Sequence, residues 1–214
     1  MSFYGKPPRE LGAHHFSLPE VMYYLYLPVV IEGSAITLPP NVERCRPLIR
    51  DAMALSRPYR YVYLSARRGW ATPDNPLNRP GWHCDGFGSD DLNFVWWRGP
   101  GTRFAVQEFT SISDDHLASL QQFDEQIRPE CVTTPGQMTL YGLDRFVVHA
   151  TPGIAAPGCE RQYVKVSLSD EKYNLEGNSH NYQFDYNWPL YSRSLVRNDT
   201  KAAQQDFCKH KDAR

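Results

Sequence analysis

His83 and Asp85 place an imidazole and a carboxylate two residues apart, in the segment PGWHCDG at residues 80–86. In an extended strand, residues i and i+2 point to the same side, so both side chains can approach one metal ion. His149, in the segment RFVVHATP at residues 145–152, can supply a third donor. Two histidines and one carboxylate on one side of a metal ion leave its other positions open. These residues therefore predict a metal centre with room for reacting ligands.

An H-x-D pair is a short motif that also arises by chance. The alternative is a surface His–Asp pair beside a turn, together with a histidine of the core. The context favours the metal centre, because Gly81 and Gly86 let the backbone turn tightly around the pair and His149 ends an apolar segment. A set of two histidines and one carboxylate with open positions is the facial triad of non-haem Fe(II) oxygenases.

The elements that must position these residues are mostly short strands. Alternating or β-branched and aromatic segments predict strands at residues 23–31, 59–64, 92–97, 102–109, 137–141, 145–149 and 161–168. Helices are expected at about 39–55, where Pro47 disturbs the pattern, and at about 114–127. Residues 65–81 are expected to form a long basic loop that leads into the His–Asp pair. Many short strands and few helices indicate a mainly β sandwich or barrel.

The strand at 161–168, RQYVKVSL, has two faces of different character. Its apolar face carries Val164, Val166 and Leu168. Its polar face begins at Arg161, and a buried guanidinium is costly unless an anion pairs with it. A carboxylate ligand would supply bidentate, charge-assisted hydrogen bonds. The polar face is thus predicted to line a cavity, and the alternative is an outer strand with a solvated face.

Together, His83, Asp85, His149 and Arg161 resemble the pattern of the Fe(II)/2-oxoglutarate-dependent oxygenases, over roughly residues 59–168. The resemblance implies a double-stranded β-helix, a cupin-like jelly-roll with a few flanking helices. It implies that the two histidines and Asp85 bind Fe(II). It also implies that 2-oxoglutarate chelates the iron as the cosubstrate with which O2 is activated.

The resemblance implies further contacts for the cosubstrate. Arg161 is expected to pair with its distal carboxylate, with Lys165 as a rival anchor. The family often has Ser or Thr two residues after this arginine; here Tyr163 stands at that position, and its phenol can donate a hydrogen bond instead. Asn93 is a candidate for contact with the C1 carboxylate.

The implied activity is a dioxygenase reaction that hydroxylates or otherwise oxidises a substrate and releases succinate and CO2. Arg67 and Arg68 are expected to contact phosphate or carboxylate groups of the substrate. Trp70 and Trp82 are expected to stack on the substrate if it is planar. The expected substrate is a small molecule or a nucleobase-type compound. A nucleic-acid substrate stays open, although a net charge of -1 gives no general attraction to a duplex.

With 214 residues, the chain is long enough for one domain with a sizeable core. We expect a single domain over 1–214, with a jelly-roll core at about 59–168, a strand and helix before it and a C-terminal extension after it. The five cysteines are scattered and form no C-x-x-C motif, which favours free thiols in a cytoplasmic protein. No apolar stretch is long enough to cross a membrane, and the first residues lack signal-peptide features.

Two other functional classes stay open. One is a cupin-type metal enzyme that does not use 2-oxoglutarate; such enzymes usually carry an additional histidine and often a glutamate near the pair, and neither Cys84 nor Gly86 extends the ligand set in that way. The other is a non-catalytic β-sandwich with a binding or structural role. Metal content after purification without a chelator separates this second class from both enzymes.

Overall fold

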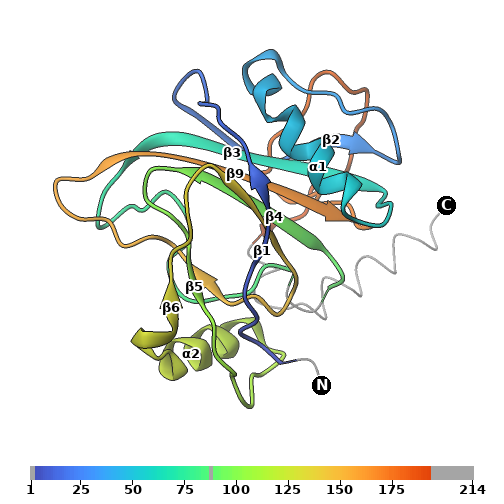
Figure 1. Cartoon of the computed structure of the whole chain (residues 1–214). Coiled ribbons are helices and arrows are strands. Elements are labelled where there is room, and N and C mark those ends of the chain that lie inside the picture. Colours follow the sequence, from blue (N-terminus) through green and yellow to red (C-terminus); the bar gives the residue numbers. More distant parts are fainter. Residues whose placement is uncertain (1–2, 87–88, 194–214) are drawn as a thin grey trace.

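The computed structural model describes residues 3–86 and 89–193, and antiparallel strands make up most of their regular secondary structure (Figure 1). One sheet has six strands, in the order β1 (Arg9–Ala13), β7 (Thr139–Leu143), β4 (Leu92–Arg98), β9 (Cys159–Ser169), β3 (Tyr61–Ala71) and β2 (Met22–Ile31). A smaller sheet has three, in the order β6 (Val132–Thr133), β5 (Arg103–Ala105) and β8 (His149–Ala150). This mainly β, jelly-roll-like architecture confirms the predicted fold class.

The two faces of the six-stranded sheet have different environments because side chains alternate along each strand. The even-numbered residues of β9, such as Val164 and Val166, join the main hydrophobic core together with Leu64 of β3 and Ile49 of α1 (Arg46–Ala54). The odd-numbered residues face the other way, toward the smaller sheet. The predicted split of the strand into an apolar and a polar face is therefore observed, and the polar face is buried as well.

The helices lie outside the sheets. Residues Pro40–Cys45 form a 3-10 helix, η1, and α1 follows with Pro47 in its first turn, where a missing N–H costs no hydrogen bond. At the other end of the molecule, α2 (His116–Gln126) lies beside β5 and β6 and is followed by a short 3-10 helix, η2 (Pro129–Cys131) (Figure 1). The Asp115 carboxylate caps α2 by accepting hydrogen bonds from two backbone N–H groups.

The segment after β9, which the sequence pattern did not place, returns along β2. Asn181 is fully buried, and its amide donates to the carbonyls of Pro28 and Thr37 at 2.8 and 3.1 Å. The N–H of Ser179 donates to the carbonyl of Leu25 at 2.7 Å. The described part of the C-terminal extension is thus an integral part of the fold.

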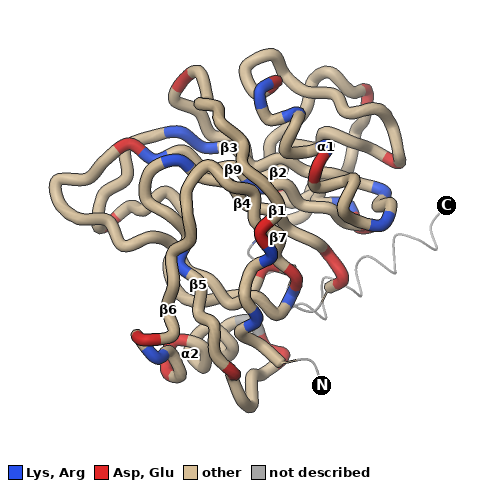
Figure 2. The backbone as a smooth tube through the Cα atoms, in the orientation of Figure 1, with Lys and Arg blue, Asp and Glu red and all other residues tan. Residues whose placement is uncertain are grey.

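Charges of both signs are spread over the tube, with basic segments on the neighbouring strands β3 and β9 (Figure 2). No helix among the described residues is both long and apolar enough to span a membrane.

Candidate metal centre

His83 and His149 lie directly opposite each other in an isolated antiparallel bridge. The N–H of each residue donates to the carbonyl of the other at 2.9 Å. Side chains of such a directly opposed pair project to the same side of the ladder, and the two imidazole centroids are 4.5 Å apart. Backbone pairing, rather than sequence proximity, brings the two histidines together.

Each imidazole has a defined orientation. The Nδ1 atom of His83 lies 3.0 Å from the carbonyl of Gly81, and that of His149 lies 3.1 Å from the carbonyl of Val147. A carbonyl oxygen only accepts hydrogen bonds, so Nδ1 carries the proton in both rings and Nε2 has a free lone pair. This is the tautomer that a metal-binding histidine needs, with the second nitrogen fixed by the backbone.

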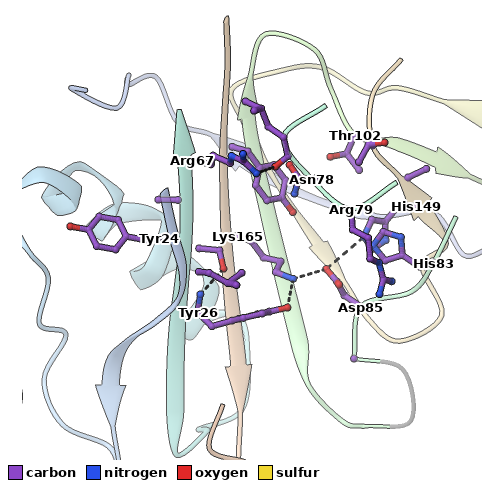
Figure 3. Close-up of a pocket in the computed structure, with 18 of the residues that line it drawn as sticks. Tyr24, Tyr26, Arg67, Asn78, Arg79, His83, Asp85, Thr102, His149 and Lys165 are labelled. Carbon is purple, nitrogen blue, oxygen red and sulfur yellow. Dashed lines mark hydrogen bonds and ion pairs between the residues drawn. The ribbon is translucent and has the colours of Figure 1, made fainter. Parts of the chain in front are cut away.

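Asp85 completes the cluster. Ligand atoms of His83, Asp85 and His149 all lie within 4.8 Å of one another, and Asp85 Oδ2 is 3.6 Å from His149 Nε2. The expected strand geometry holds only in part, because the bridge ends at His83 and the chain turns at Asp85 and Gly86. The carboxylate nevertheless reaches the same point as the imidazoles (Figure 3).

The electrostatics of the cluster suit a cation. Burial, followed by the proximity of His149, lowers the pKa of His83 to about 3, so the ring is neutral and available as a ligand. Burial alone would raise the pKa of Asp85, but Lys165 and the two histidines outweigh it and hold that pKa well below its ordinary value. Two neutral imidazoles and one carboxylate are donors that fit Fe(II).

Lys165 of β9 is the immediate partner of Asp85. Its Nζ donates to Asp85 Oδ2 at 3.1 Å and to the Tyr26 hydroxyl at 3.0 Å (Figure 3). Burial lowers the pKa of Lys165, but the attraction of Asp85 and nearby phenols raises it above its ordinary value. Lys165 is therefore a cation already committed to one carboxylate.

The cluster opens into a cavity of about 680 Å³, lined by residues of both sheets and of the loops between them. Arg161, Tyr163 and Lys165, all from the polar face of β9, lie along it, as the sequence predicts. Arg161 is 1% exposed, and its guanidinium lies 4.9 Å from the centroid of the Tyr163 ring. The cavity thus places a buried guanidinium and the three candidate metal ligands around one space.

No carboxylate among the described residues forms an ion pair with Arg161. Its Nε donates to the carbonyl of Pro100 at 3.0 Å, and its Nη1 donates to the carbonyl of Pro76 and the side chain of Asn78. None of these three hydrogen bonds involves Nη2. Burial lowers the pKa of Arg161 to about 10, which is still high enough to keep it charged.

Arg67 of β3 reaches the same loop. Its Nη1 donates to the carbonyl of Leu77 at 2.5 Å, and its guanidinium lies over the Tyr23 ring. Successive oxygens of the 76–78 segment, which we term the strap, therefore bind two neighbouring guanidinium groups. Leu77 has a φ of 69°, which is unusual for a leucine.

Several other predicted contact residues lie away from the cavity. Arg68 pairs with Glu160 at 2.8 Å, and Trp70 is 61% exposed. Both are even-numbered residues of β3 and point away from the face that Arg67 presents. Trp82 is buried in a second core beneath Arg103, and Asn93 accepts a 2.6 Å hydrogen bond from Ser167. The cavity lining includes none of these four residues.

Other residues of the lining were not predicted from the sequence, among them Tyr26, Asn78 and Thr102. Tyr26 lies where the pairing of β2 with β3 is irregular, and its φ is 47°. Such a bulge turns a side chain away from the regular alternation, so strand periodicity does not predict where it points.

No protein-family model matches the chain, and no curated protein matches it. Among solved structures, the chain is similar to EvdO2 from Micromonospora carbonacea var. aurantiaca, with 17% identity and a TM-score of 0.36. It is also similar to EvdO2 complexed with 2-oxoglutarate, with 16% identity and a TM-score of 0.34. Each match covers 61% of this chain and 60% of the EvdO2 chain. TM-scores this low do not establish a common fold, so the assignment of the site rests on its own geometry.

Proposed function

We propose that this protein is an Fe(II)- and 2-oxoglutarate-dependent dioxygenase that hydroxylates or otherwise oxidises a substrate and releases succinate and CO2. The observation that carries the proposal is one cavity that joins a His83–Asp85–His149 cluster to a buried guanidinium, which has no carboxylate partner among residues 3–86 and 89–193. The cluster suits Fe(II), and the guanidinium suits a carboxylate of the cosubstrate.

His83, Asp85 and His149 would hold the iron from one side of the cavity. Bound there with 2-oxoglutarate, Fe(II) would supply the activation of O2 for substrate oxidation. The backbone carbonyls of Gly81 and Val147 hold both Nδ1 atoms, which would leave both Nε2 atoms free to bind the iron. Lys165 fixes Asp85 by a hydrogen bond and offsets part of its charge.

Arg161 is the better of the two candidate anchors for the distal carboxylate. Lys165 already has a carboxylate partner in Asp85, whereas Arg161 has only neutral oxygen acceptors among the described residues. A buried ion gains most from a new partner when it lacks one. The planar guanidinium also offers the fork that a carboxylate matches.

The substrate that we propose is a small molecule that enters the same cavity. Arg67 lines it and can meet an anionic group, whereas Arg68 and Trp70 face outward and are not proposed as contacts. A cytoplasmic location remains a prediction. The four described cysteines are free thiols, in keeping with a reducing compartment.

Turnover tests this proposal. Protein loaded with Fe(II) in air should convert 2-oxoglutarate into succinate in the absence of another substrate, slowly but catalytically, and His149→Ala should not. Zero succinate from wild-type protein that has bound iron would favour a cupin-type metal enzyme without this cosubstrate. Absence of metal binding would favour a non-catalytic role.

A further inference from the structure

A row of aromatic rings leads from the metal cluster to the surface of the C-terminal extension. Each ring contacts the next, and the centroid distances are 5.0 Å for Tyr26–Tyr173, 4.2 Å for Tyr173–Tyr63, 6.2 Å for Tyr63–Tyr61, 5.7 Å for Tyr61–Trp188 and 4.6 Å for Trp188–Tyr186. We term these six residues the aromatic row. All six carry the side chains that proteins oxidise most readily by one electron, apart from cysteine.

The inner end of the row is bonded to the metal cluster. The Tyr26 hydroxyl is 3.0 Å from Lys165 Nζ, which is 3.1 Å from the carboxylate of Asp85. Two hydrogen bonds therefore separate this phenol from a proposed iron ligand. Tyr26 also lines the cavity, so its ring borders the space in which O2 would react.

Tyr173, in the middle of the row, has the contacts needed to lose an electron together with a proton. Tyr173 stacks on Tyr63 with an interplanar angle of 7°, and its hydroxyl donates to Asp91 Oδ2 at 2.6 Å. A carboxylate at this distance can take the phenol proton when the ring loses an electron, and return it when the ring is reduced. Tyr63 is fully buried, and its hydroxyl donates to the carbonyl of Glu171.

The outer end of the row reaches solvent. Tyr61 meets Trp188 edge-on at 89°, and Tyr186 stacks on His180. Tyr182, which contacts His180, is 90% exposed. A small reductant in solution could therefore donate electrons at this end.

Packing alone does not account for the choice of tyrosine. Phenylalanine would fill nearly the same volume. Each buried tyrosine hydroxyl needs a hydrogen-bond partner, whereas a phenyl ring needs none. The row keeps those hydroxyls and supplies their partners, which are Lys165, Asp91, Glu32 and backbone carbonyls or N–H groups.

We propose that the aromatic row conducts single electrons from the surface to the iron site when O2 is activated without a substrate to oxidise. The inference rests on the proposed function. The oxidant would be the iron after O2 activation, when it holds two more oxidising equivalents than Fe(II) and no substrate has used them. One electron passes from Tyr173 through Tyr26 to the iron, and the phenol proton of Tyr173 moves to Asp91. An electron from Trp188 then restores Tyr173, which recovers its proton, and a soluble thiol or ascorbate reduces Trp188. A second passage would return the iron to Fe(II), and the atom of O2 that does not enter succinate would take two protons from solvent and leave as water.

The test combines electron paramagnetic resonance with peptide mass spectrometry. Protein loaded with Fe(II) and 2-oxoglutarate, without substrate or reductant, is mixed with O2 and frozen at intervals. The wild type should show a tyrosyl radical, and oxygen addition should follow at Tyr186 and Trp188. Both signals should be absent from protein without iron.

Tyr173→Phe keeps the stacked ring but removes the hydroxyl, and should lower the radical signal and the oxidation of Trp188 at least tenfold. Asp91→Asn should slow radical formation and change its solvent deuterium isotope effect, which a merely structural contact would not. The matched control is Tyr141→Phe. Tyr141 is also buried and stacked, on Trp97, but among the described rings it reaches His149 through the phenyl ring of Phe104, which is hard to oxidise. Loss of the Tyr141 hydroxyl should leave the radical signal and the oxidation of Trp188 unchanged.

Trp188→Phe, at the periphery, replaces Tyr173→Phe as the test if Tyr173→Phe does not fold. It should prolong the lifetime of the tyrosyl radical.

Hydrogen peroxide in place of O2 and 2-oxoglutarate separates this inference from the proposed function, because peroxide oxidises Fe(II) without a cosubstrate. A radical with peroxide but no succinate with 2-oxoglutarate would refute the proposed function and support the aromatic row. Succinate formation with no radical from either oxidant would overturn the row. Equal radical yields in wild type and Tyr173→Phe, or in loaded and iron-free protein, would overturn it as well.

Discussion

At the scale of single residues, the two buried cations of the site, Lys165 and Arg161, differ in whether they have a carboxylate partner. Lys165 and Asp85 form a pair, and the low pKa of Asp85 shows that its environment favours the charged form. Arg161 is also buried, but its hydrogen-bond acceptors within the described part of the chain are carbonyl and amide oxygens. This asymmetry, rather than position in the sequence alone, distinguishes the two candidate anchors.

Arg161→Ala should weaken 2-oxoglutarate binding by about 2–5 kcal/mol, because a partly buried charged contact is lost. At about 1.4 kcal/mol per tenfold, the dissociation constant should rise by one to several orders of magnitude. Arg161→Lys should recover only part of the loss, since an ammonium lacks the planar fork. Calorimetry on iron-loaded, anaerobic protein measures the dissociation constant of 2-oxoglutarate for the wild type and for both variants.

Lys165→Ala is the internal control for that series. It should mainly weaken iron binding, because it removes the hydrogen bond that holds Asp85. A large loss of 2-oxoglutarate binding in Lys165→Ala with none in Arg161→Ala would instead assign the anchor to Lys165.

At the scale of elements, the polar face of β9 was predictable because a period of two is a direct consequence of strand geometry. The choice between Arg67 and Arg68 was not, because it depends on strand register. Arg67 pairs with Tyr163 and shares its face, whereas Arg68 pairs with Gln162 on the other. The strap at residues 76–78 and the bulge at Tyr26 were not predictable from the sequence either. Both depend on local backbone conformations that side-chain periodicity does not encode.

The three candidate metal ligands were predictable as residues, but their geometry was not. The H-x-D spacing suggested a strand, whereas Asp85 lies in a turn. What unites the histidines is the reciprocal backbone pairing of residues 83 and 149, which are far apart in the sequence. Residue types therefore identified the cluster, and only the tertiary fold explains it.

Helix α2 supports the second core, in which Phe123 is fully buried. Asp115→Ala removes its N-terminal cap and should lower the free energy of unfolding by about 0.5–2 kcal/mol. Iron affinity should change little, because α2 supplies no ligand. Urea unfolding checks the first expectation and iron titration the second. Asp114→Ala, at the neighbouring exposed position, is the control; a loss as large as that of Asp115→Ala would argue against the capping role.

At the scale of the whole molecule, the proposed metal ligands come from two separate stretches of chain, the bridge residue and turn at 83–85 and β8. A ligand that binds only the folded state stabilises it, by about 2.7 kcal/mol at a concentration one hundred times its dissociation constant. Anaerobic Fe(II) should therefore raise the melting temperature of the wild type, and a chelator should reverse the rise.

His149→Ala should lose this thermal shift, whereas His15→Ala, which alters an exposed histidine, should keep it. An equal shift in His149→Ala and wild type would place the iron elsewhere. The comparison needs no substrate and no turnover.

An anaerobic titration of the protein with Fe(II) and 2-oxoglutarate, followed by visible absorption, tests most directly whether iron and the cosubstrate bind together in this cavity. Chelation of iron by the cosubstrate produces a metal-to-ligand charge-transfer band. We expect this band at one iron and one 2-oxoglutarate per chain, no band in His149→Ala, and a band that needs far more 2-oxoglutarate in Arg161→Ala. Wild-type protein that binds iron but develops no band at any 2-oxoglutarate concentration would contradict this expectation.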